Sequence, residues 1–277
     1  MTAAPMTAAP AGSDTRSRRR CGIPGGVLGL AGFAGLILLL ELLPRIGAVD
    51  ARFLPPFSEM ATALGGELGS AAFWDALVAT LRGWAIGLAV AMAAGVAAGF
   101  LIGSVPALRA ATSSTIEFLR PIPSVALIPL AVLLFGSDMR STLLLVVYAS
   151  FWQVLVQVLY GVVDVDPIAR DTARSYRFSP WRQVRTVLWP TALPYVMTGF
   201  RLAAAVALIL EITGELIIGS PGLGNAIAVA QSSGAVATMY ALVIVTGVIG
   251  VGVNLLARRV ERRVLRWHPS VRREVTS

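Results

Sequence analysis

Six long apolar runs, separated by polar segments that carry arginines, constrain this chain more than any other feature. They lie at about Val27–Leu43, Ala76–Gly103, Pro121–Phe135, Ser141–Val163, Tyr195–Ile218 and Ala237–Ala257. About 20 apolar residues cross the hydrocarbon core as a helix, so every run except the short, proline-interrupted third one is long enough. Charged residues make up only 14% of the sequence, too few to cover a globular surface. The sequence predicts an all-α membrane protein with about six transmembrane helices.

The distribution of arginine predicts the orientation of these helices. Basic residues concentrate in the cytoplasmic loops of membrane proteins. With the amino terminus inside, nearly all basic segments become cytoplasmic, and the opposite side holds only Arg45, Arg52 and Arg140. We therefore expect a multi-pass protein with both termini in the cytoplasm.

The same pattern divides the chain into three parts. Residues 1–25 form a basic leader whose composition predicts disorder, residues 26–260 a transmembrane domain, and residues 261–277 a basic cytoplasmic tail. The first apolar run is long for a secretory signal and is followed by no small-residue cleavage site, so we expect an uncleaved first span.

The residue types exclude several chemistries. All 23 basic residues are arginine, so the chain lacks the lysine of a phosphate-binding P-loop and of Schiff-base catalysis. The single histidine, His268, lies in a polar tail, and the single cysteine, Cys21, has no partner for a disulfide. We expect no catalytic residues, no metal site and no cofactor. Nucleic-acid binding is also not expected, because the arginines lie in blocks beside apolar runs rather than on a soluble domain.

The second apolar run contains a regular stripe of small residues. They recur every four positions, at Gly83, Gly87, Ala91, Gly95, Gly99 and Gly103. Small residues at this spacing let a second helix approach closely within a membrane. The stripe therefore predicts a helix-packing face.

One polar segment, residues 164–194, is longer than a simple connection requires. Asp166-Pro167 and Ser179-Pro180 are typical helix starts, since aspartate and serine cap a helix and proline suits its first turn. Pro190 and Pro194 are expected to end the segment. The pattern predicts two short, basic, amphipathic helices on the cytoplasmic side.

This segment resembles the EAA loop of binding-protein-dependent ABC importer permeases. The matching residues are Asp171-Thr172-Ala173, then Arg177, then Val187 and Trp189-Pro190 at the family's spacing. The segment from Phe118 to Leu130, with Phe135-Gly136, resembles the sulfonate/nitrate/taurine branch of that family. Two positions depart from the pattern, because Arg177 replaces the family glycine and Trp189 the family leucine.

The resemblance implies the fold of a type I ABC importer permease in a prokaryotic plasma (inner) membrane. It further implies a second copy of the permease, two cytoplasmic ATPase subunits that bind the ATP, an extracytoplasmic solute-binding protein, and surrounding membrane lipid. The implied cargo is a small oxyanion such as an alkanesulfonate, taurine or nitrate. The loop residues implied to couple to the ATPase are Asp171, Thr172, Ala173, Arg177, Ser179, Trp181, Val187 and Pro190.

Two glutamates in the fifth run, Glu211 and Glu215, are unusual at membrane depth. They lie one helical turn apart and either line a translocation path or dimer surface, or are satisfied structurally by a neighbouring helix. With the first possibility we group Pro121, Pro123 and Phe135 of the third run. A rival function, an ion-coupled secondary carrier that uses Glu211 and Glu215, leaves the long cytoplasmic loop unexplained.

Overall fold

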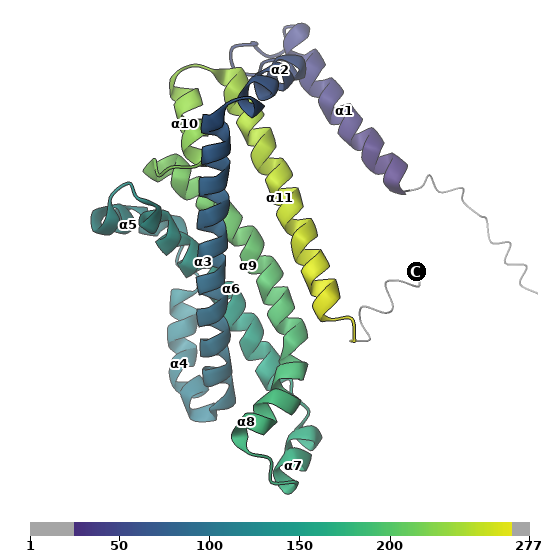
Figure 1. The fold of residues 1–277 in the computed structure, drawn as a ribbon, viewed down its shortest axis with the longest axis vertical. Coiled ribbons are helices and arrows are strands. Elements are labelled where there is room, and N and C mark those ends of the chain that lie inside the picture. The colour runs from purple at the N-terminus through teal and green to yellow at the C-terminus, as the bar shows by residue number, and fades with distance from the viewer. Residues whose placement is uncertain (1–24, 268–277) are drawn as a thin grey trace, which may run out of the picture.

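The computed structural model describes residues 25–267, and every regular element in that range is helical (Figure 1). The predicted leader lies almost wholly outside the described residues, as does the tail from His268 onward. The elements in chain order are α1 (Gly25–Arg45), α2 (Phe57–Leu68), α3 (Ala71–Ser104), α4 (Pro106–Leu119), η1 (Ser124–Leu127), α5 (Ile128–Phe135), α6 (Met139–Val163), α7 (Pro167–Ser175), α8 (Pro180–Gln183), η2 (Val184–Leu188), α9 (Trp189–Ile218), α10 (Leu223–Ser232) and α11 (Val236–Val264).

The number of spans agrees with the prediction when bent helices are counted. Four described helices are long and apolar enough to cross a membrane, namely α1, α3, α6 and α11. Two bent pairs raise the number to as many as six: α4 with η1–α5, bent by 82°, and the helix Pro180–Ile218 with α10, bent by 41°. The predicted third run is therefore a broken helix, as its prolines led us to expect.

The predicted small-residue stripe is confirmed as a packing face of α3. From Gly87 to Gly103 it faces α6, where the glycines lie against Val146, Val154, Val158 and Val162. A Cβ atom added at Gly95 would lie 2.8 Å from the Cβ of Val154, and one at Gly99 would lie 2.6 Å from that of Val158. These distances are too short for any larger residue, so the glycines set the separation of α3 and α6.

Helix α6 also packs closely on α9, so α3, α6 and α9 form the core. Here Gly161 lies against Ala192, and Gly214 lies against Thr142. The indole nitrogen of Trp84 on α3 donates a hydrogen bond of 2.9 Å to the carbonyl oxygen of Ala204 on α9. Such bonds stabilise helix pairs in a membrane, where polar groups find few other partners.

The other helices lie around this core (Figure 1). Helices α7 and α8 lie at one end of the molecule, and α2 and α10 lie at the opposite end. Helix α11 packs on α2, α9 and α10, whereas α1 leans away from the body and contacts only α2 extensively.

Pro190 and Pro194 do not end the loop segment, contrary to expectation. Pro190 is in the first turn of α9 and Pro194 is inside that helix. The preceding residues Val184–Leu188 form a π-helical turn that joins α8 directly to α9. The helix therefore continues through both prolines. The short helices α2, α4 and α10 lie where the sequence predicted only polar connections.

Candidate functional site

The segment between α6 and α9 forms two short helices that begin at the predicted caps. The Asp166 carboxylate accepts a hydrogen bond of 2.9 Å from the backbone N–H of Ile168 at the start of α7. The Ser179 hydroxyl accepts one of 3.4 Å from the N–H of Arg182 at the start of α8. We call residues 164–188 the docking loop.

The bend between α7 and α8 occurs at Arg177, which has a φ of 52°. This is the left-handed conformation that glycine adopts readily and arginine does not, and it costs a non-glycine residue roughly 1–2 kcal/mol. Thus the bend keeps the geometry that the glycine pattern requires, and Arg177 is strained. Two hydrogen bonds hold the turn. The backbone N–H of Phe178 donates one of 3.0 Å to the Ala173 carbonyl oxygen, and the Gln183 side-chain amide donates one of 3.0 Å to the Phe178 carbonyl oxygen.

The docking loop exposes large apolar side chains at the tip of the molecule. Ile168, Tyr176 and Trp181 are each about three-quarters exposed. Arginines surround them, and the Arg182 guanidinium lies 4.2 Å from the centre of the Phe178 ring. An apolar patch with a basic rim, at the end of a helical bundle, is typical of a protein-binding surface.

The predicted coupling residues divide between the exposed tip and its support. Asp171, Thr172 and Ser179 are exposed. Ala173 is only 4% exposed, so it packs α7 from inside rather than lying on the outer face with its neighbours. Val187 is half-buried against the core.

The base of the docking loop is fixed to the core helices. Trp189, which replaces the family leucine, stacks on Phe100 of α3 with ring centres 5.5 Å apart. The Tyr195 hydroxyl of α9 donates a 2.7 Å hydrogen bond to the Asp164 carboxylate at the end of α6. These contacts tie both ends of the docking loop to the core helices.

The two membrane glutamates lie inside the subunit rather than on a surface. Glu211 and Glu215 are each 1% exposed. One Glu215 oxygen accepts hydrogen bonds from the Thr80 hydroxyl (2.9 Å) and from the N–H of Gly224 (2.8 Å). The Thr80 hydroxyl oxygen in turn accepts a hydrogen bond of 2.9 Å from the backbone N–H of Leu223. The geometry therefore favours a structural role for Glu215, because this hydrogen-bond network fastens α10 to α3 and α9.

Close contacts with these carboxylates explain why positions 83 and 222 are occupied by glycine. The Glu211 carboxylate lies against Gly83, and the Glu215 carboxylate lies against Gly222. A side chain at either position would overlap the carboxylate. The Gly222-Leu223-Gly224 motif is therefore required by close packing at the start of α10.

The residues grouped with the glutamates lie elsewhere, on an open apolar face. Pro121, Pro123 and Phe135 are exposed. Next to them, α5 and α6 line a groove of about 740 Å³ with residues that are almost all apolar: Leu127, Leu130, Phe135, Arg140, Leu143, Leu144, Val147, Tyr148, Phe151 and Trp152. The exposed Phe135 is thus separate from the buried Glu211 and Glu215, contrary to the predicted grouping.

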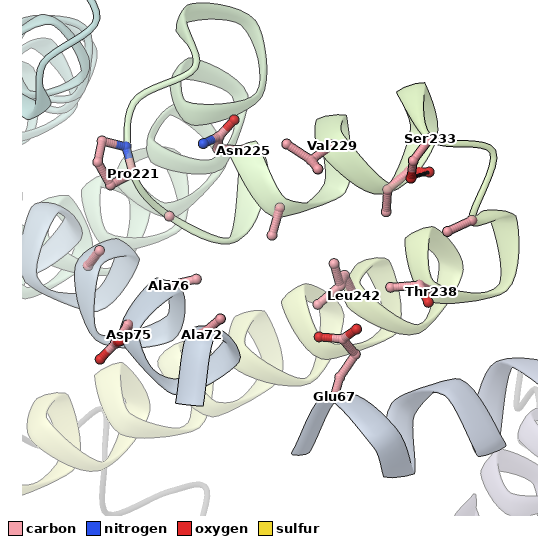
Figure 2. Close-up of a pocket in the computed structure, with 15 residues that line it drawn as sticks. Glu67, Ala72, Asp75, Ala76, Pro221, Asn225, Val229, Ser233, Thr238 and Leu242 are labelled. Carbon is pink, nitrogen blue, oxygen red and sulfur yellow. Dashed lines mark hydrogen bonds between the residues drawn. The ribbon is translucent and has the colours of Figure 1, made fainter. Parts of the chain in front are cut away.

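A second pocket, of about 630 Å³, lies at the end opposite the docking loop (Figure 2). Figure 2 shows Asn225 and Val229 of α10 on one side, Asp75 of α3 on another, and Glu67 at the end of α2. Its lining includes these two carboxylates and no arginine, so its charge repels anions. Among the described residues, no three His, Cys, Asp or Glu side chains come together to hold a metal ion.

Comparison with known families identifies the chain. The sequence profile of the family described as "Binding-protein-dependent transport system inner membrane component" matches residues 85–266. The chain belongs to this family of importer permeases. The match includes the docking loop, so the resemblance drawn from residues 171–190 is confirmed.

Full-length relatives support the same assignment. The permease is 28% identical to the putative aliphatic sulfonates transport permease protein SsuC of Bacillus subtilis, over 96% of this chain and 95% of the relative. It is 29% identical to the taurine transport system permease protein TauC of Escherichia coli, over 88% and 90%. It is 27% identical to the bicarbonate transport system permease protein CmpB of Synechococcus elongatus, over 88% and 91%.

A solved structure of the MetNI methionine ABC transporter has the same fold. Its matched chain superposes with a TM-score of 0.61 at 16% identity, and covers 70% of this permease and 96% of that chain. The permease is therefore a non-catalytic, multi-pass inner-membrane component of an ABC importer, and ATP hydrolysis and solute capture belong to separate partner proteins.

Proposed function

We propose that the docking loop is the surface through which this permease is driven by its ATPase subunits. The observation that carries this proposal is the exposure of Ile168, Tyr176 and Trp181 on short helices that are fixed to α6 and α9. Apolar side chains exposed outside the lipid need a protein partner, and their rigid base lets a movement of that partner reach the core.

Substitution of Trp181 tests this proposal. Because Trp181 is exposed, Trp181→Ala removes a contact surface without disturbing the fold. We expect co-purification of the ATPase subunits to fall at least about tenfold, as for a central aromatic residue of an interface. Phe53→Ala is the matched control, because Phe53 is equally exposed but lies in the connection between α1 and α2. Retention of the ATPase by the Trp181 variant, or equal loss with the Phe53 variant, would contradict the proposal.

The proposed placement puts the docking loop and both termini in the cytoplasm, as the arginine distribution indicates. A membrane-impermeant maleimide reagent distinguishes the two sides. In a Cys21→Ser background, Tyr176→Cys should be labelled only after the cell is opened, and Phe53→Cys in intact spheroplasts. The opposite labelling would overturn both this placement and the ATPase assignment.

The open face of α5 and α6 is proposed to bind a second copy of the permease. Its groove is apolar and lies on helices that already contact the core, and Leu133, also on α5, is 82% exposed. Two such faces packed together would enclose a passage between the copies, bordered by Pro121, Pro123 and Phe135.

The proposed cargo is a small oxyanion, by analogy with relatives named for sulfonates, taurine and bicarbonate. The acidic pocket in Figure 2 is not proposed as its site, because Glu67 and Asp75 would repel an anion. Uptake of labelled taurine, ethanesulfonate, nitrate and bicarbonate, compared between cells with and without the permease, tests the class. Uptake of none of these would reject the oxyanion assignment while leaving the coupling proposal intact.

A further inference from the structure

A narrow groove between α9 and α11 changes character along its length. It has a volume of about 180 Å³ and is lined by Arg201, Ala204, Ala205, Leu208, Ile209, Gly250, Val253, Asn254 and Ala257. Arg201 lies at one end, and Leu208 and Ile209 lie about two helical turns away along α9; on α11, Asn254 lies one turn from Gly250. The groove therefore has a polar end and an apolar end.

The polar end lies at the membrane surface. The Arg201 guanidinium is 3.3 Å from the carboxylate of Glu261, which places it level with the last turns of α11. The apolar part of α11 ends at Ala257, and arginines follow immediately, at positions 258, 259, 262, 263 and 266. Such a boundary marks where a helix leaves the hydrocarbon. The apolar end of the groove consequently extends into the bilayer.

Two of these arginines extend the edge of the groove. Asn254, Arg258 and Arg262 are spaced four residues apart and so form one row along α11. The Arg262 side chain lies along this row, with its Nε donating 3.4 Å to the carbonyl oxygen of Arg258. Glu261 is the only acidic residue in the described part of these turns, and Arg201 pairs with it. The net charge at the polar end is therefore positive.

We propose that this groove binds an anionic phospholipid, with the phosphate near Arg258, Arg262 and Arg201 and one acyl chain along Leu208, Ile209 and Gly250. Water does not fill an apolar groove at membrane depth, so a hydrocarbon chain is the natural occupant. Arginines directly beside a transmembrane helix attract anionic headgroups by about 1 kcal/mol each. The side that carries the groove is not the one proposed for the second copy, because α5 and α11 lie on opposite sides of α3 in Figure 1.

The test uses the full chain purified in mild detergent with whatever subunits co-purify. Native mass spectrometry would follow the binding of dioleoyl phosphatidylglycerol and dioleoyl phosphatidylcholine, which differ in headgroup charge. We expect the anionic lipid to bind at about tenfold lower concentration. Equal binding of the two lipids would overturn the proposal.

Charge-matched variants distinguish this site from a general attraction to a basic protein. Arg258→Gln with Arg262→Gln should abolish the preference for the anionic lipid. Arg259→Gln with Arg263→Gln removes the same charge from a different row of α11. This variant should keep most of the preference for the anionic lipid. Equal loss in both double variants would show that no defined site exists, and the proposal would fail.

Glycine variants test the acyl-chain part of the groove. A Cβ at Gly250 meets only Leu208 Cδ2, at 3.9 Å, so Gly250→Leu fills the groove without overlap. We expect it to lower lipid occupancy at least about threefold, whereas Gly252→Leu, whose Cβ meets nothing within 4 Å, should not. Unchanged occupancy with Gly250→Leu would reject the groove as the binding site. Thermal unfolding without added lipid confirms that each variant is folded, and none of these measurements depends on transport.

Discussion

The carboxyl group of Glu211 occupies the space in which the Cβ atom of residue 83 would stand. Glu211 is almost wholly buried, and one of its oxygens has no hydrogen-bond partner among the described residues. The pair thus fixes how closely α9 approaches α3. Its geometry also determines what a substitution at either position should do.

Gly83→Ala should destabilise the permease by about 1–3 kcal/mol, because the new methyl group displaces Glu211 from a packed interior. Adding Glu211→Ala should recover much of this loss, since the shorter side chain makes room. The thermal unfolding midpoint of purified protein measures both effects. Gly252→Ala is the control, as its Cβ meets nothing within 4 Å. Additive losses in the double variant would show that the two residues do not interact.

Thr80→Val should loosen the start of α10. The substitution keeps the side-chain shape but leaves the N–H of Leu223 unpaired and removes one donor from Glu215, at a cost of about 1–3 kcal/mol. Faster hydrogen exchange at Leu223 and Gly224 is the expected signal. Thr80→Ser retains the hydroxyl and should exchange as the wild type does. Equal exchange in the valine and serine variants would exclude the hydroxyl as the fastening group.

Arg177→Gly should stabilise the docking loop by about 0.5–1 kcal/mol, because glycine adopts a φ of 52° without strain. Hydrogen exchange in residues 173–180 should slow. The paired variant Arg174→Gly removes the same side chain from the last turn of α7 and should speed exchange, since glycine disfavours a helix by up to about 1 kcal/mol. If both variants speed exchange, charge rather than backbone conformation controls the loop.

A photo-reactive residue at position 133 should cross-link two copies of the permease. Leu133 is an exposed residue of α5, the helix that we propose as part of the contact between copies, whereas Val248 lies on α11 and is also exposed. Denaturing gels should show a dimer-sized product for the first position and little for the second. The reverse result would place the contact between copies on α11. The proposed lipid groove would then be covered by the second copy and would not face the bilayer.

The spans, the stripe of small residues and the helix starts at Asp166 and Ser179 were predictable from the sequence because each is a local pattern. The packing of Gly83 against Glu211 was not, since it joins positions that are distant in the chain. The capping of α10 was not predictable either, because its first N–H groups donate to Thr80 and Glu215 instead of to a neighbouring cap residue. One local signal was available: the Gly222-Leu223-Gly224 motif indicated close backbone packing without identifying its partner.

The continuity of α9 was not predictable for a different reason. Pro190 and Pro194 are normally signs of a helix end. Here a π turn precedes Trp189, and the helix continues through both prolines.

This continuity has a mechanical consequence. From Pro180 to Ile218 the chain is helical without a break, with a π turn at Val184–Leu188, and is roughly 58 Å long at 1.5 Å per residue. The end in the docking loop carries Trp181. The opposite end carries Glu215, which holds α10 by a hydrogen bond to the N–H of Gly224. If the proposed ATPase contact is correct, we expect a push on the tip to be transmitted along this helix as tilt or rotation at the opposite end, beside the acidic pocket.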